Sequence, residues 1–191
     1  MGFYKKLMIE NFEFVSKFIL LLLIAVLFKI VPHLPNFSPE LVFSVCLATQ
    51  YKKLNAIFFG LSLWVVCDFV YSVSHGVNVF GSWSLGTYSG IFIIMLIASV
   101  FKVNLNNYFL VILTSASSIF FWIWTNLTVW IFSGLYSHTI TGLSECYFFA
   151  LPFLGYSLMA AIFWAVFLIF SRCTYLKFGL LSLSKIDEKL V

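Results

Sequence analysis

The eleven residues 18–28, FILLLLIAVLF, contain no charged and no polar side chain. Working outward, the apolar stretch extends over about 14–31, and a proline-rich segment follows it. A helix needs about 20 mostly apolar residues to cross a membrane. No small-residue cleavage site follows the stretch, although Lys5 and Lys6 precede it. We therefore interpret 14–31 as an uncleaved first transmembrane span and not as a signal peptide.

The composition of the 191-residue chain points the same way. Hydrophobic residues make up 62% and charged residues 9%, against about 45–50% and about 25% in soluble domains. These values exclude a soluble globular enzyme, a disordered tail and a nucleic-acid-binding protein. The net charge of +4 is more typical of membrane-topology signals than of a phosphate-binding surface. No cofactor motif is present.

Continuous apolar runs elsewhere predict an all-α membrane protein, because transmembrane strands would alternate. The six predicted spans form a single domain and cover about 14–31, 39–51, 54–70, 86–101, 107–131 and 141–171. The second span is short, since about 13 residues cover only about 20 Å of a roughly 30 Å core. We expect non-helical backbone in the proline-rich segment 32–39 to complete that crossing.

The positions of the cations predict the orientation of this bundle. With six spans, both termini and the second and fourth connections lie on one side of the membrane. These segments hold Lys5, Lys6, Lys17, Lys52, Lys53, Lys102, Arg172, Lys177, Lys185 and Lys189. Only Lys29 falls near the other side, so the positive-inside rule places both termini in the cytoplasm, across the inner (cytoplasmic) membrane. The outer connections, about 32–40, 71–86 and 132–145, are longer and indicate a site open to the outside.

The fifth span carries the clearest polar signal within an apolar run. Trp122, Asn126 and Trp130 follow at i, i+4 and i+8, so they share one stripe of the helix. An amide in hydrocarbon is costly unless it is hydrogen-bonded, so Asn126 faces either the bundle or a cavity. An amide between two indoles suits a ring-shaped ligand. An interhelical hydrogen bond with an interfacial aromatic belt explains the stripe equally well.

The other polar residues at the outer end leave several readings open. Asp68 is the only carboxylate within an apolar run, which favours a ligand contact or proton site over a helix cap. A metal site would have to combine ligands from separate loops, without tight spacing: His33, His75, His138, Glu40, Asp68 and Glu145. Cys67 and Cys146 both lie near outer helix ends and are the candidate pair for a disulfide. Neither of these last two arrangements is expected to form.

The order of motifs along the chain resembles that of a known group. The motifs are Pro35-Asn36-Phe37-Ser38-Pro39, Asp68, Thr87-Tyr88, Phe120-Phe121, Thr125-Asn126, Trp130, Tyr136, Thr139, Gly142-Leu143, Cys146-Tyr147 and Ala150-Leu151-Pro152-Phe153. Over about residues 15–170 this order resembles a family of small bacterial membrane proteins. That family is similar to the substrate-binding S components of energy-coupling-factor (ECF) vitamin transporters. The resemblance implies a bundle without catalytic activity that binds its ligand near the outer face. It also implies a membrane coupling protein and two ATPases as partners.

The leading hypothesis is therefore a solute-binding membrane subunit for uptake of a vitamin-like micronutrient. The candidate ligand-binding residues are Asn36, Asp68, Tyr88, Trp122, Asn126, Trp130, Tyr136 and Tyr147. A structural or scaffolding membrane protein without a ligand is the first alternative. The second is an intramembrane enzyme acting on lipid, which would need an acid–base pair from Asp68, Glu145 and the outer histidines.

Overall fold

The computed structural model describes residues 2–51, 53–101 and 107–187, and within these ranges the chain forms six α-helices and no strand. The helices are α1 (Gly2–Ile30), α2 (Glu40–Gln50), α3 (Lys53–His75), α4 (Ser82–Ala98), α5 (Asn107–Phe132) and α6 (Ile140–Asp187). The prediction of an all-helical protein is confirmed. Three helices extend well beyond their predicted spans, because α1 begins at Gly2, α3 continues to His75 and α6 continues to Asp187. Lys52, Lys102 and Lys189, which entered the charge sorting, lie outside the described residues.

Three described helical segments are long and apolar enough to cross a membrane: Lys53–His75, Tyr108–Phe132 and Ile140–Ser171. Two shorter apolar helices, Glu40–Gln50 and Trp83–Ala98, lie among them. These lengths and compositions indicate a membrane protein. Many large apolar side chains on the outside of the helices are exposed, such as Leu23, Phe58 and Phe148. An apolar outer surface of this kind suits contact with lipid.

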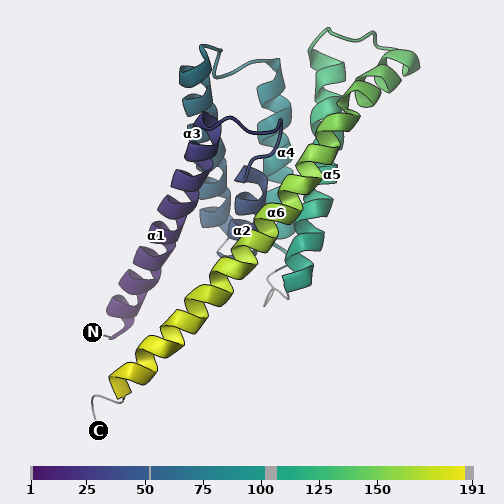
Figure 1. The fold of residues 1–191 in the computed structure, drawn as a ribbon. Coiled ribbons are helices and arrows are strands. Elements are labelled where there is room, and N and C mark those ends of the chain that lie inside the picture. The colour runs from purple at the N-terminus through teal and green to yellow at the C-terminus, as the bar shows by residue number, and fades with distance from the viewer. Residues whose placement is uncertain (1, 52, 102–106, 188–191) are drawn as a thin grey trace.

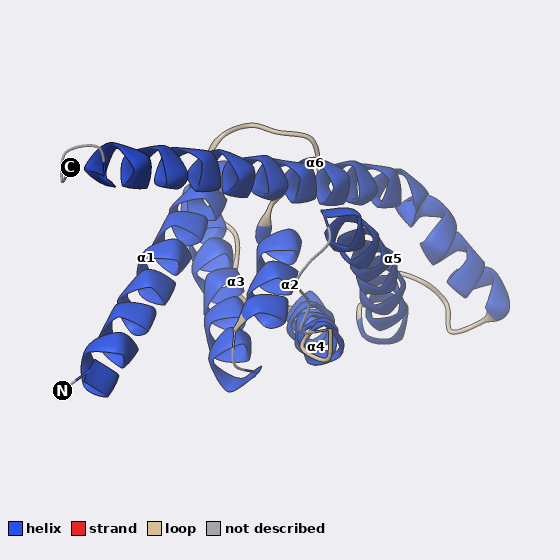
Figure 2. Ribbon diagram, turned by 90° about the horizontal axis from the view of Figure 1, so that it is seen from below, coloured by secondary structure: helices blue, strands red, loops and turns tan. Residues whose placement is uncertain are grey.

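The connections α3–α4 and α5–α6 lie at one end of the molecule, and both termini point toward the other end (Figure 1). Helix α6 lies across one face of the other five helices and bends in its N-terminal part (Figure 2). Pro152 is inside that helix. A proline lacks the N–H of the helical ladder and clashes with the preceding turn, which accounts for the bend.

The shortest helix is the central one. Helix α2 contacts α3, α4, α5 and α6. Eight of its eleven residues are buried, including Phe43, Val45 and Leu47. A helix surrounded on all sides needs no polar face, which explains why its sequence shows no amphipathic period.

The segment between α1 and α2 is non-helical, as predicted from its prolines. The amide of Phe37 donates a hydrogen bond to the carbonyl of Leu34 at 3.0 Å, which closes a tight turn. Pro35 is at the second position of this turn, and Asn36 at the third has a φ of 58°. Proline followed by a residue with positive φ is the pattern that type II turns favour. The turn brings the chain back into the bundle, where Pro39 and Glu40 are buried.

Candidate functional site

A cavity of about 380 Å³ lies among all six helices and the segment between α1 and α2. It adjoins the halves of the helices that lead to the connections 31–39, 76–81 and 133–139. Its lining residues are Lys29, Asn36, Ser38, Leu41, Val42, Trp64, Asp68, Trp83, Thr87, Ser118, Phe121, Trp122, Thr125, Asn126, Ala150, Phe153, Ser157, Ala160 and Ala161. Ligand pockets commonly have volumes of about 300–1,000 Å³ and combine apolar walls with a few polar groups.

Asp68 and Tyr88 form one polar contact beside this cavity. The hydroxyl of Tyr88 on α4 donates a hydrogen bond to Oδ2 of Asp68 on α3, at 2.8 Å. Asp68 lines the cavity, whereas Tyr88 stands behind it. Among the described residues Oδ1 of Asp68 accepts no hydrogen bond. The carboxylate is therefore held by one hydrogen bond and has acceptor capacity left.

Lys29 and Glu40 form an ion pair at the same end. Nζ of Lys29 on α1 lies 2.8 Å from Oε1 of Glu40 on α2, and the Glu40 side chain is completely buried. The contact lacks hydrogen-bond geometry, and neither oxygen of Glu40 has a hydrogen-bonding partner in the described part of the chain. The sequence had placed Glu40 both in the outer connection 32–40 and in the second span, 39–51. In the structure it is the first residue of α2, and the turn at Asn36 carries Pro39 and Glu40 inward.

Trp122 and Asn126 form part of the opposite side of the cavity, on α5. The indole Nε1 of Trp122 donates to the carbonyl of Ala150 on α6, at 2.9 Å. The amide Nδ2 of Asn126 donates to the carbonyl of Trp122 at 2.8 Å, within its own helix. The interhelical bond considered for the Asn126 side chain is therefore not formed among the described residues, and its Oδ1 is left without a donor.

Trp130 does not line the cavity, although it belongs to the same stripe of α5. Its Nε1 donates to the carbonyl of Ser137 at 2.9 Å, and its ring meets His138 edge to face. From Trp122 to Trp130 the helix rises about 12 Å, and the direction of the side chain turns by about 80° around the helix axis. Trp130 therefore lies one turn beyond the cavity, toward the α5–α6 connection. Tyr136, in that connection, does not line the cavity either.

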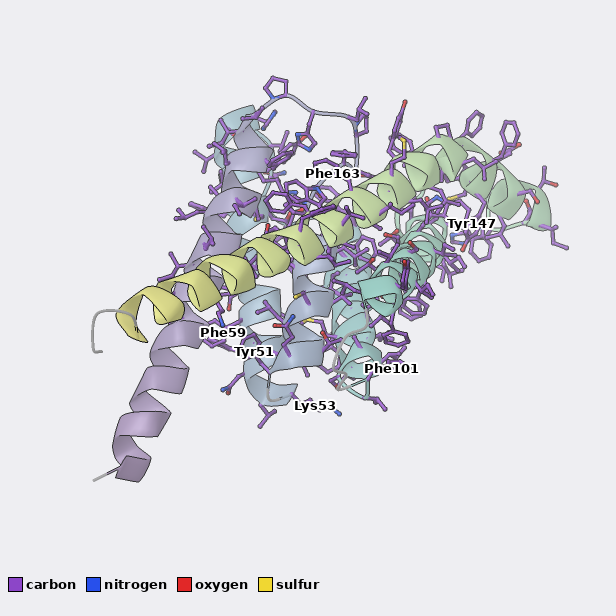
Figure 3. All side chains as sticks on the ribbon, turned by 60° about the horizontal axis from the view of Figure 1, so that its bottom comes forward. Tyr51, Lys53, Phe59, Phe101, Tyr147 and Phe163 are labelled. Atoms are coloured by element: carbon purple, nitrogen blue, oxygen red, sulfur yellow. The ribbon has the colours of Figure 1, made fainter. Side chains whose placement is uncertain are left out.

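Tyr147, which is labelled in Figure 3, is not among the residues that line the cavity. Its hydroxyl on α6 donates to the carbonyl of Ile123 on α5 at 2.8 Å, and its ring packs edge to face on Trp122 with centroids 5.1 Å apart. Of the eight predicted residues, the structure thus brings Asn36, Asp68, Trp122 and Asn126 to one cavity. Tyr88 and Tyr147 contact two of these four from behind.

Close helix packing holds α5 in place beside α4. A Cβ at Gly86 would overlap Oγ1 of Thr128, and one at Gly90 would crowd Trp124. Beside these glycines, Nε1 of Trp124 donates to Oγ of Ser89 at 2.8 Å. Glycines four residues apart let two helices approach closely. The two glycines therefore serve packing inside this bundle.

Several lining residues had not been singled out from the sequence. In the sequence, Lys29 stood out only as the cation that lies near the opposite side of the predicted bundle from the others. Trp64 and Trp83 had no signal, because aromatic residues are common along every span. Phe153 was part of a quoted motif, but nothing in its spacing pointed to a cavity.

In the part of the chain that the structure describes, His33, His75 and His138 do not come together in a metal site. His33 bonds to the carbonyl of Val31, His75 stacks on Tyr71, and His138 contacts Trp130. Among the described residues no group of three or more His, Cys, Asp or Glu side chains could hold a metal ion. Cys67 and Cys146 are buried free thiols on α3 and α6, so the structure does not join them.

A second hollow, of about 560 Å³, lies on the outer side of α6. Its lining residues are all apolar and come from that helix alone: Met159, Ile162, Phe163, Val166, Phe167 and Phe170. Phe163 is labelled in Figure 3. This surface offers no polar group that could select a solute, and it suits lipid.

Residues 10–181 match the model of a family of unknown function, DUF6580, and the chain belongs to this family. No curated protein and no solved structure matches the chain.

Proposed function

We propose that this member of DUF6580 is a membrane-embedded solute-binding subunit for the uptake of a vitamin-like micronutrient. It acts like the S components of ECF transporters and carries out no chemistry on its ligand. The ligand occupies the 380 Å³ cavity among the six helices. A membrane coupling protein and cytoplasmic ATPases are the proposed partners, and they would supply the energy for release.

The observation that carries this proposal is the lining of the cavity. Two ionisable residues, Lys29 and Asp68, meet three tryptophans and the amide of Asn126 around one space. Charged side chains within a membrane bundle are costly and mark ligand or ion pathways. Aromatic walls with few polar groups are typical of sites for small ring compounds.

The proposed orientation has six membrane crossings with both termini in the cytoplasm. The short helix α2 would cross together with the non-helical segment before it, which is permitted where such backbone is buried in protein. The cavity then lies near the outer face of the membrane, because it adjoins the outer connections. We expect a reporter enzyme fused after Val191 to be active if it is of a kind that works only in the cytoplasm. A reporter of a kind that works only outside the cytoplasm should be inactive at this position.

The function is tested by mass spectrometry of small molecules released from the purified protein. Wild type, Asn126→Ala and Trp130→Ala are prepared in parallel. Asn126 lines the cavity, whereas Trp130 lies on the same helix but outside it, so the two variants form a matched pair. We expect one compound enriched in wild type and in Trp130→Ala, and reduced about tenfold or more in Asn126→Ala, as expected for loss of a buried hydrogen bond in a binding site.

Equal enrichment in all three proteins would move the ligand away from this cavity. No enriched compound in any of them, after growth in rich medium, would favour a scaffolding protein that binds a protein partner instead.

A further inference from the structure

Several polar groups around the cavity present hydrogen-bond acceptors to it. The hydroxyls of Thr87, Thr125 and Ser157 donate to carbonyls of their own helices, at 3.2, 2.8 and 2.9 Å. A hydroxyl has only one hydrogen to donate, so each of these side chains offers the cavity lone pairs.

The amide of Asn126 is limited in the same way. A carbonyl oxygen, that of Trp122, faces its Nδ2 at 2.8 Å. The atom facing a carbonyl must be the NH₂ group, which leaves the Oδ1 acceptor for a ligand. Oδ1 of Asp68 is a further acceptor without a donor among the described residues.

Lys29, Glu40 and Asp68 together carry a net charge of −1 when all three are ionised. The charge of Lys29 is balanced by Glu40, which lies 2.8 Å away and is completely buried behind the cavity. Asp68 has only the neutral hydroxyl of Tyr88 as its hydrogen-bonding partner. One carboxylate charge therefore remains beside the cavity without a cation of its own. An unbalanced charge in a low-dielectric site attracts an opposite charge strongly.

Two of the three tryptophans of the cavity, Trp64 and Trp122, offer ring surface more than N–H groups. Nε1 of Trp64 donates to Oγ of Ser44 at 3.1 Å, and Nε1 of Trp122 donates to the carbonyl of Ala150. Indole rings whose donors are already used provide stacking and cation–π contacts.

From these groups we infer that the ligand is an aromatic organic cation with N–H donors, and that its positive end binds Asp68. This inference rests on the proposed function and names its class of substrate. The charged amine or ring nitrogen lies at Asp68, between α3 and α4. The ring lies against Trp64 and Trp122. Lys29 contributes donors to the cavity, but no net charge.

The test uses three probes that share an indole ring and differ in charge: tryptamine, indole-3-acetamide and indole-3-acetate. The full-length protein is placed in nanodiscs of phosphatidylcholine, which carries no net charge. Equilibrium dialysis against an equimolar mixture of the probes, with quantification by mass spectrometry, gives the amount retained. Empty nanodiscs correct for partitioning into lipid.

We expect wild type to retain tryptamine at least about tenfold over indole-3-acetate, as for a charge-assisted hydrogen bond. Asp68→Asn keeps the size of the side chain and removes its charge, so the ratio should fall to about one. The matched control is Glu145→Gln, which removes an exposed carboxylate from α6 outside the cavity, and the ratio should stay as in wild type.

Retention of the acetate or the acetamide over tryptamine would overturn the charge class and leave the proposed function standing. A ratio unchanged by Asp68→Asn would also overturn it. If wild type retains no probe above empty nanodiscs, aromatic cations of this size are not its ligands. The compounds released from wild type and Asn126→Ala then decide separately whether the protein binds a solute at all.

Discussion

The side of the cavity formed by α1, α2 and α3 carries charge, whereas the side formed by α5 and α6 carries none. On the first side, Lys29, Glu40 and Asp68 come from three different helices and meet at one end of the bundle. On the second side, Trp122 and Asn126 come from one helix, and their partners are backbone carbonyls. The charged side depends on distant parts of the chain meeting, and the uncharged side depends mainly on helix packing.

The two sides should therefore respond differently to substitution. Removing one member of a buried ion pair leaves the other charge without compensation, which is among the costliest changes in a protein interior. Removing a neutral hydrogen bond costs less, about 0.5–1.5 kcal/mol. Small changes of volume in a tight helix contact fall between these values.

The largest effect is expected at Glu40. Glu40→Gln puts a neutral amide at a fully buried position beside the ammonium of Lys29, whose side chain is 17% exposed. We expect a loss of stability of about 3–5 kcal/mol. The measurement is the unfolding midpoint of the purified protein in detergent, compared with wild type.

Two further variants sharpen this result. Glu145→Gln removes an exposed carboxylate and should change stability by no more than about 0.5 kcal/mol. The double variant Lys29→Met, Glu40→Leu replaces the whole pair with apolar side chains and should recover most of the loss. A double variant as unstable as Glu40→Gln would mean that the pair contributes net stability.

The difference between the two sides also explains how much the sequence could predict. Helices and the stripe of Trp122 and Asn126 follow from hydropathy and spacing within one segment, and the structure has both of these residues at the cavity. Asp68 stood out because a carboxylate within an apolar run is rare. These signals are local, so a single sequence contains them.

The ion pair had no such local signal. Glu40 follows a proline-rich segment and reads as part of a loop, and Lys29 reads as a cation on the wrong side. Only the turn at Asn36, with its positive φ, brings the two together. The stripe of Trp122, Asn126 and Trp130 extends past the cavity between Asn126 and Trp130. The position of this boundary likewise depends on where the other helices end.

The next largest effect is expected in the contact that holds the uncharged side. Gly86→Ala places a Cβ against Thr128 and should cost about 1–3 kcal/mol, since the backbones of α4 and α5 must separate. Gly155 is the matched control, because nothing lies within 4 Å of a Cβ added there. Gly155→Ala should stabilise α6 by about 0.5–1 kcal/mol through helix propensity. Equal effects of both alanines on the unfolding midpoint would contradict the close contact at Gly86.

The smallest effect is expected at Tyr88, and it separates charge from orientation on the charged side. Tyr88→Phe removes the hydrogen bond to Oδ2 of Asp68 and keeps both the ring and the carboxylate. Because the charge beside the cavity is unchanged, the ratio of tryptamine to indole-3-acetate in the dialysis experiment should stay within about threefold of wild type, or about 0.7 kcal/mol. If the ratio instead falls to about one, as expected for Asp68→Asn, then the orientation that Tyr88 gives to the carboxylate produces the selectivity. In that case Tyr88 is a positioning residue for the ligand, and the charge of Asp68 alone is insufficient.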